Sequence, residues 1–133
     1  MKYEKKNIKK INSLWWLPLF VGILIYIFLR PDDLIYNDLF SSPIKIKINT
    51  NSKVVNFLVY SLPNGLWSMS FSQLIFHIYK IRTLKIIILS SIMLFVGIII
   101  ELLQYQSFMN GTFDINDIFS YIISYLIVLF IQK

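Results

Sequence analysis

Four apolar runs divide this chain, and charged or turn-forming residues stand between them. A transmembrane helix needs about 20 predominantly apolar residues, so runs of this kind constrain the fold more than any other feature. Only 15% of the residues are charged and 56% are hydrophobic, whereas soluble domains carry about 25% charged residues. The pattern therefore predicts an all-α polytopic membrane protein. We expect a compact bundle of four transmembrane helices over residues 14–29, 54–79, 84–105 and 115–131.

The chain divides into two parts by charge. Residues 1–13 form a Lys-rich segment, and residues 14–133 hold the four apolar runs as a single transmembrane domain. A signal peptide also begins with basic residues and an apolar stretch, but no small-residue cleavage site follows the first run. Trp15 and Trp16 suit the headgroup region of a bilayer, so we expect a retained helix. Cysteine is absent, which excludes disulfides and thiolate metal sites.

The positions of Lys and Arg indicate how the predicted spans are oriented. Five lysines lie in residues 1–13 and three basic residues in 80–85, whereas no Lys or Arg separates the third run from the fourth. The positive-inside rule then places both termini and the 80–85 loop in the cytoplasm. The four basic residues of 30–53 oppose this orientation but are outnumbered. Because the net charge of +6 comes from these flanking clusters, we expect a lipid bilayer as partner and no nucleic acid. The absence of alanine indicates an AT-rich bacterial genome, so the expected location is the bacterial cytoplasmic membrane.

The second run carries a predicted polar stripe. Its polar residues recur every four positions, which in an α-helix places them on one face. In lipid such a face must meet protein or a water-filled cavity, and we expect its outer half to face the carboxylate end of the third run. Pro63 lacks a backbone donor and can bend the helix there. Alternatively, the stripe only holds helices together. It consists of Asn56, Tyr60, Asn64, Ser68 and Ser72.

Acidic residues gather where the third run ends and the fourth begins. Glu101 and Gln104 are three residues apart and share a helical face. Only fifteen residues separate Asp117 from Lys133, about 23 Å of helix, so Asp117 can be drawn below headgroup level. Asp114 and Asp117 could instead cap the fourth helix. The predicted functional pocket consists of Glu101, Gln104, Asp114, Asp117, Asn64, Asn56 and Tyr60, with Arg30 as the available counter-charge.

Several short motifs resemble the VanZ-like family of small bacterial integral membrane proteins. Residues 101–104 (ELLQ) and 111–117 (GTFDIND) are similar to the family's E-x-x-Q motif and the loop with D-x-x-D that follows it. Residues 61–67 (SLPNGLW) resemble the Pro-containing second helix, and residues 29–31 (LRP) the end of the first helix. The resemblance implies a compact multi-helix membrane protein with its acidic motif on the extracytoplasmic side. The family is named for an association with glycopeptide resistance in the cell envelope.

Three classes of function stay open at this point. We rank first a binding or accessory protein that presents an outer-side polar pocket to an envelope lipid or a lipid-linked envelope molecule. The alternatives are a membrane enzyme that uses Glu101 or Asp117 as general acid or base, and a structural subunit of a membrane complex. No phosphate loop, zinc spacing or nucleophile elbow is present, so we predict no cofactor and no resident metal. Carboxylates Glu101, Asp114 and Asp117 could still bind a divalent cation through oxygen ligands.

Overall fold

The structure is a computed structural model, and it describes residues 14–29 and 52–132. Every element in these ranges is a helix, so the all-α class predicted from the sequence is confirmed. The Lys-rich residues 1–13 and the segment 30–51 lie outside the described residues. In chain order the elements are α1 (Trp16–Leu29), α2 (Lys53–Asn56), the π-helical turn η2 (Phe57–Ser61), α3 (Leu62–Tyr79), α4 (Leu84–Ser90), α5 (Ile92–Tyr105) and α6 (Ile115–Ile131).

The second apolar run folds as one uninterrupted helical segment made of α2, η2 and α3. Pro63 stands in the first turn of α3, where a residue without an N–H group is tolerated. Just before it, the Leu62 N–H bonds to Phe57 O, and this five-residue spacing is that of a π-helix. Because Pro63 cannot donate to the carbonyl four residues earlier, the backbone widens into this turn. The helix therefore accommodates Pro63 without being interrupted.

The third apolar run, 84–105, is two helices where one was predicted. α4 ends at Ser90, and α5 continues at a bend of 41°. Hydroxyl groups from two other helices hold the break: Ser72 of α3 donates to Ser90 O at 2.8 Å, and Tyr125 of α6 donates to Ile87 O at 2.8 Å. Side chains that bond into the backbone of a helix are an identifiable cause of kinks. The bend is thus fixed by polar groups that hydropathy alone does not reveal.

Helix length and apolar content bear directly on the four predicted spans. No single helix in the described ranges is both long enough and apolar enough to cross a bilayer. α4 and α5 reach the required length and composition together, as a bent pair, and α1 and α6 are apolar helices of shorter length. The four transmembrane spans therefore stay a prediction.

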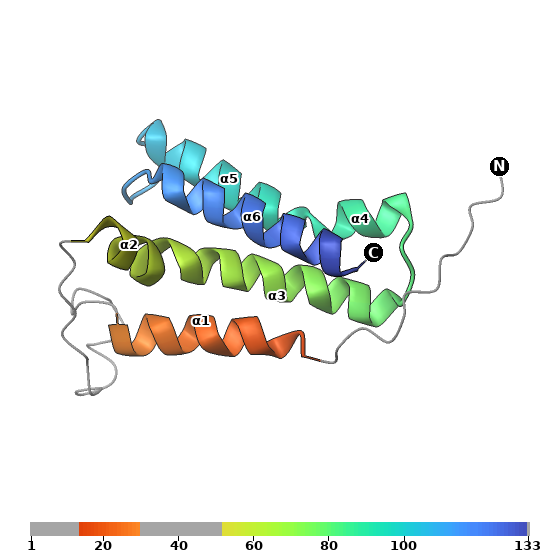
Figure 1. Ribbon diagram of the computed structural model, residues 1–133. Helices are drawn as coiled ribbons and strands as arrows, with labels where there is room; N and C mark the ends of the chain where they lie inside the picture. Colours follow the sequence, from red (N-terminus) through yellow and green to blue (C-terminus); the bar gives the residue numbers. More distant parts are fainter. Residues whose placement is uncertain (1–13, 30–51, 133) are drawn as a thin grey trace.

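α3 lies at the centre of the described helices (Figure 1). α6 and the α4–α5 pair pack on it, whereas α1 contacts only α3 and η2 among the described elements. α1 is apolar all round and buries only Pro18 and Gly22, so it has no second face that ties it to the other helices. Within the described residues, the expected compact bundle is thus a cluster of α3, α4–α5 and α6 with α1 attached on the outside.

The described residues bury polar side chains and expose apolar ones. Ten polar or charged residues are buried, eight of them serines, against five hydrophobic residues. Thirty-two large hydrophobic residues are exposed, and they lie on every long helix. A small apolar core of Phe76, Ile86 and Val128 lies beside the 80–85 loop. Soluble domains usually have the reverse distribution, because apolar residues leave water on folding.

α3 and α6 pack closely at Gly65. A Cβ atom at this position would lie 2.5 Å from Ser124 Oγ and 2.7 Å from Ser120 O. Ser68 and Ser72 continue the buried small-residue face along α3. Small residues let helix backbones pack closely, as they do in membrane proteins. This close packing brings the start of α3 against the first turn of α6, where the candidate site lies.

Candidate functional site

The loop 106–114 ends at Asp114, which is the N-cap of α6. Asp114 Oδ1 accepts a hydrogen bond from Asn116 N at 2.8 Å, and the Asp114 backbone is extended. An N-cap carboxylate satisfies a free helix N–H group and interacts favourably with the positive end of the helix dipole. Asp114 therefore has the capping role that the sequence allowed as an alternative. Its carboxylate accepts a hydrogen bond from the first turn of α6.

Glu101 connects the end of α5 to the start of α6. Its side chain is 5% exposed, and its Oε2 atom accepts the Asp114 backbone N–H at 3.1 Å. A buried carboxyl group needs such partners, because removing a charge from water without them is unfavourable. The bond also fixes where the chain enters α6. Glu101 thus positions the N-terminus of α6 from a neighbouring helix.

Asp117 lies in the first turn of α6 and faces two other helices. Its Oδ2 atom accepts a hydrogen bond from Asn64 Nδ2 of α3 at 2.8 Å. Its carboxyl group also lies beside the Glu101 carboxyl group of α5. Side chains from α3, α5 and α6 therefore meet at Glu101 and Asp117, which we call the carboxyl pair.

Ser61 is a site residue that the sequence interpretation missed. It is 1% exposed, it ends η2, and it lies beside the Asp117 carboxyl group. Ser61 Oγ and Asp117 Oδ1 are both buried, and neither makes a hydrogen bond of standard geometry to the described residues. A signal was present in the sequence: positions 61, 65, 68 and 72 carry Ser, Gly, Ser and Ser, a small-residue face at helical spacing.

The remaining predicted pocket residues differ in their exposure and contacts. Asn56 is exposed and Tyr60 is half-buried, because the wider π turn breaks the four-residue spacing that put them in line with Asn64. Gln104 packs against Gly111 of the loop and leaves no room there for a Cβ atom. Arg30 lies outside the described residues. Asn64 bonds to Asp117 whereas Asn56 is exposed, so the residues of the predicted stripe are not buried alike.

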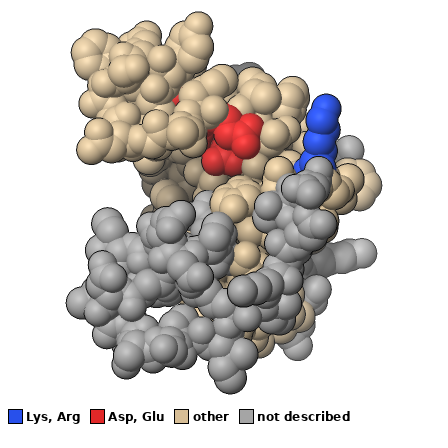
Figure 2. All heavy atoms as spheres, turned by 90° about the vertical axis from the view of Figure 1, so that its left-hand side faces the viewer, with Lys and Arg blue, Asp and Glu red and all other residues tan. Residues whose placement is uncertain are grey.

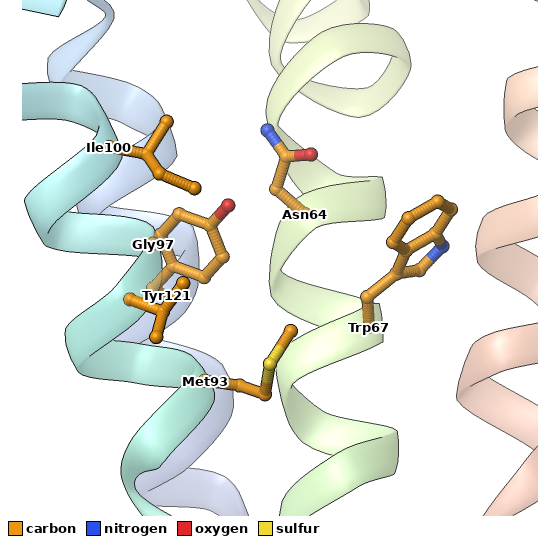
Figure 3. Close-up of a pocket in the computed structure, with 7 residues that line it drawn as sticks. Asn64, Trp67, Met93, Gly97, Ile100 and Tyr121 are labelled. Carbon is orange, nitrogen blue, oxygen red and sulfur yellow. The ribbon is translucent and has the colours of Figure 1, made fainter.

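A partly open cavity of about 60 Å³ lies between α3 and α5, one helical turn from the carboxyl pair. Tyr121 follows Asp117 by four residues, and its ring covers Gly97, which precedes Glu101 by four residues. Figure 3 shows Asn64 and Tyr121 directed into the gap between α3 and α5, whereas Trp67 points toward α1. Apolar side chains form most of the wall. The complete lining is Asn64, Trp67, Met93, Val96, Gly97, Ile100 and Tyr121.

The acidic residues and most of the basic residues of the described ranges lie at opposite ends of the helices. The acidic residues of the described ranges all lie where η2, the end of α5 and the start of α6 meet. Figure 2 shows acidic atoms at the surface of this end. Lys53 accompanies them, whereas the three basic residues of 80–85 lie at the other end (Figure 1). We call these the acidic end and the basic end.

Chemically, the acidic end offers a group of hydrogen-bond acceptors. The acceptors are the carboxyl oxygens of Glu101 and Asp117 and the hydroxyl of Ser61. Among the described residues, no group of three or more His, Cys, Asp or Glu is arranged to hold a metal ion. No protein-family model, curated protein or solved structure matches this chain. Its function must therefore be argued from the site itself.

Proposed function

We propose that this chain is an integral protein of the bacterial cytoplasmic membrane, with both termini and the basic end in the cytoplasm. The observation that carries the proposal is its polarity: serines and carboxyl groups are buried between helices, and large apolar side chains cover the outside. In lipid this distribution is favourable, because polar groups find partners inside the protein and apolar side chains meet acyl chains. The proposed spans are α1, the α2–η2–α3 segment, the bent α4–α5 pair and α6.

At the acidic end, the proposed activity is binding of the polar headgroup of an envelope lipid or a lipid-linked envelope molecule. Glu101 and Asp117 present acceptor oxygens, so the headgroup they suit must carry hydrogen-bond donors such as an ammonium or hydroxyl groups. Asp117 Oδ1 and Ser61 Oγ are buried beside each other, and both can accept hydrogen bonds. Charge-assisted bonds to a donor headgroup would satisfy these atoms.

The cavity between α3 and α5 supports an approach from the side. Asn64 both lines this cavity and bonds to Asp117, so the cavity and the carboxyl pair are adjacent. Its apolar wall suits an alkyl chain that stays in contact with lipid while the headgroup reaches the acids. The outer-side position of the site is part of the proposal, and it rests on the distribution of Lys and Arg and on the resemblance to VanZ-like proteins.

A structural role for the carboxyl pair is the second candidate. The Asp114 N–H bond to Glu101 and the Asn64 bond to Asp117 tie three helices together without any ligand. A network of this kind stabilises a fold when all its members are satisfied. Under this alternative, neutralising the acids would change stability and nothing else.

Native mass spectrometry of the full chain, released from lipid nanodiscs, separates the two roles. We expect the wild type to retain phosphatidylethanolamine, whose ammonium has N–H donors, in preference to phosphatidylcholine, whose ammonium has none. Asp117→Asn and Glu101→Gln keep the side-chain shape and should lose this preference while keeping thermal stability. Lys85→Gln removes a charge at the basic end and should bind like the wild type.

The opposite results would contradict headgroup binding. A wild type that shows no preference between the two lipids, or acid variants that bind normally, would remove the basis for the proposed site. If Asp117→Asn and Glu101→Gln lose thermal stability and lipid in parallel, the structural role is supported instead.

A further inference from the structure

The loop between α5 and α6 exposes aromatic and apolar side chains at the acidic end. Tyr105 is 69% exposed and Phe108 76% exposed, and Met109 and Phe113 are exposed as well. No charged residue lies between Glu101 and Asp114. A water-facing loop is usually polar, since exposed polar groups solvate the connection between helices. This loop therefore exposes four aromatic or apolar side chains among its polar ones.

Hydrogen bonds and ring contacts hold the loop in this form. Tyr105 and Phe113 stack edge to face with their ring centroids 5.2 Å apart, which joins the two ends of the loop. The Phe108 N–H bonds to Leu103 O at 2.9 Å, and Ser107 has a positive φ of 59°. The backbone thus turns directly after α5 and presents Phe108 outward. The exposed ring of Phe108 is therefore held in place by the backbone of this turn.

The two acids that flank the loop point away from this apolar surface. Glu101 is buried and bonded to the Asp114 N–H, and the Asp114 carboxylate caps α6. The exposed apolar surface also continues along both helices beside the loop: Ile99 and Leu102 lead to Tyr105 on α5, and Ile115 and Phe119 follow on α6. The loop therefore completes one continuous apolar exterior that spans the length of both helices.

We propose that residues 105–113 lie in the interfacial region of the outer leaflet, with Phe108 inserted among the lipids. Tyr is enriched in this region, because its ring is apolar and its hydroxyl reaches the headgroups. The ring of Phe108 is wholly apolar and suits the acyl chains below the headgroups. We favour a lipid surface over a protein partner because exposed apolar side chains continue from the loop along α5, with Ile99 and Leu102, and along α6, with Ile115 and Phe119. This inference rests on the proposed membrane location, but it does not depend on headgroup binding at the carboxyl pair.

Spin labels on single cysteines test the inference, because the chain has no native cysteine. The full chain would carry Phe108→Cys, Asn110→Cys or Ile123→Cys in vesicles of phosphatidylethanolamine and phosphatidylglycerol. Collisions with oxygen report lipid, and collisions with a water-soluble nickel chelate report water. We expect a higher oxygen-to-nickel ratio at position 108 than at position 110 and a high ratio at position 123 on the exposed face of α6. All three residues are exposed, so their substitution leaves the packing intact.

Each contrary result points to a different failure. Nickel access at position 108 together with oxygen access at position 123 would overturn the loop inference and leave the membrane location standing. Nickel access at position 123 would overturn both. Protection of position 108 from both reagents would indicate a protein contact, and would also overturn the lipid assignment.

Discussion

The acidic end and the basic end of the helical cluster differ in how far their charged side chains are buried. At the acidic end, Glu101 is buried and Asp117 is half-buried, and both are bonded to other helices. At the basic end, Lys80 and Lys85 are exposed. Exposed charges contribute little to stability because water solvates them well. Buried charges whose partners are removed are strongly unfavourable.

The charged residues at the two ends therefore differ in the roles that we expect for them. The exposed lysines of the basic end have the position and sign that orient a membrane protein toward the cytoplasm. The acids of the acidic end are arranged around one another, with Asn64 and Ser61 beside them. The acids therefore interact with other helices, and we expect their substitution to have larger effects than substitution of the exposed lysines.

Asp117→Ala should have the largest effect on folding. It leaves Asn64 Nδ2 without its acceptor and Glu101 without its neighbour, and an unsatisfied buried polar group costs about 1–3 kcal/mol. Chemical unfolding of the full chain in detergent micelles measures the loss. Lys85→Ala is the matched control at the basic end, and we expect it to unfold like the wild type. Equal destabilisation by the two variants would remove the contrast between the ends.

Helix caps offer a smaller test of the same contrast, because each end has one. Asp114 caps α6 with a bond of 2.8 Å, whereas Thr83 caps α4 with a bond of 3.4 Å. Losing an N-cap typically costs about 1 kcal/mol, so we expect Asp114→Ala to approach this value. Thr83→Ala should cost less, since its bond is longer and weaker. Thermal unfolding compares the two variants, and a larger loss for Thr83→Ala would contradict the ranking.

Hydropathy predicts that the helices exist, because a helix of this kind is marked by a long run of apolar residues. The fourth expected span, 115–131, has the bounds of α6, and the first, 14–29, contains α1. The kink after Ser90 could not be predicted this way, since it depends on hydroxyl groups donated by Ser72 and Tyr125 from distant parts of the chain. Long-range polar contacts leave no mark in local periodicity.

The candidate site was predictable only in part, for a similar reason. Glu101, Asp117 and Asn64 carry the polar groups that a membrane environment would force together, so their clustering could be inferred. Asn56 and Ser61 could not be placed, because both positions depend on the π turn of η2 before Pro63. Strict four-residue spacing put Asn56 in line with Asn64, whereas the structure exposes Asn56 and buries Ser61. The widened turn of η2 therefore leaves Asn56 exposed and places Ser61 in the buried site.

Cysteine labelling in intact bacterial cells tests most directly whether a membrane separates the two ends. Asn110 lies in the exposed loop of the acidic end, and Thr83 lies in the loop of the basic end. Each would be replaced by a single cysteine, which is possible without background because the chain has none. A membrane-impermeant thiol reagent is expected to label Asn110→Cys and to label Thr83→Cys only after the cells are opened. Labelling of Thr83→Cys and not Asn110→Cys in intact cells would contradict the account and place the carboxyl pair on the cytoplasmic side.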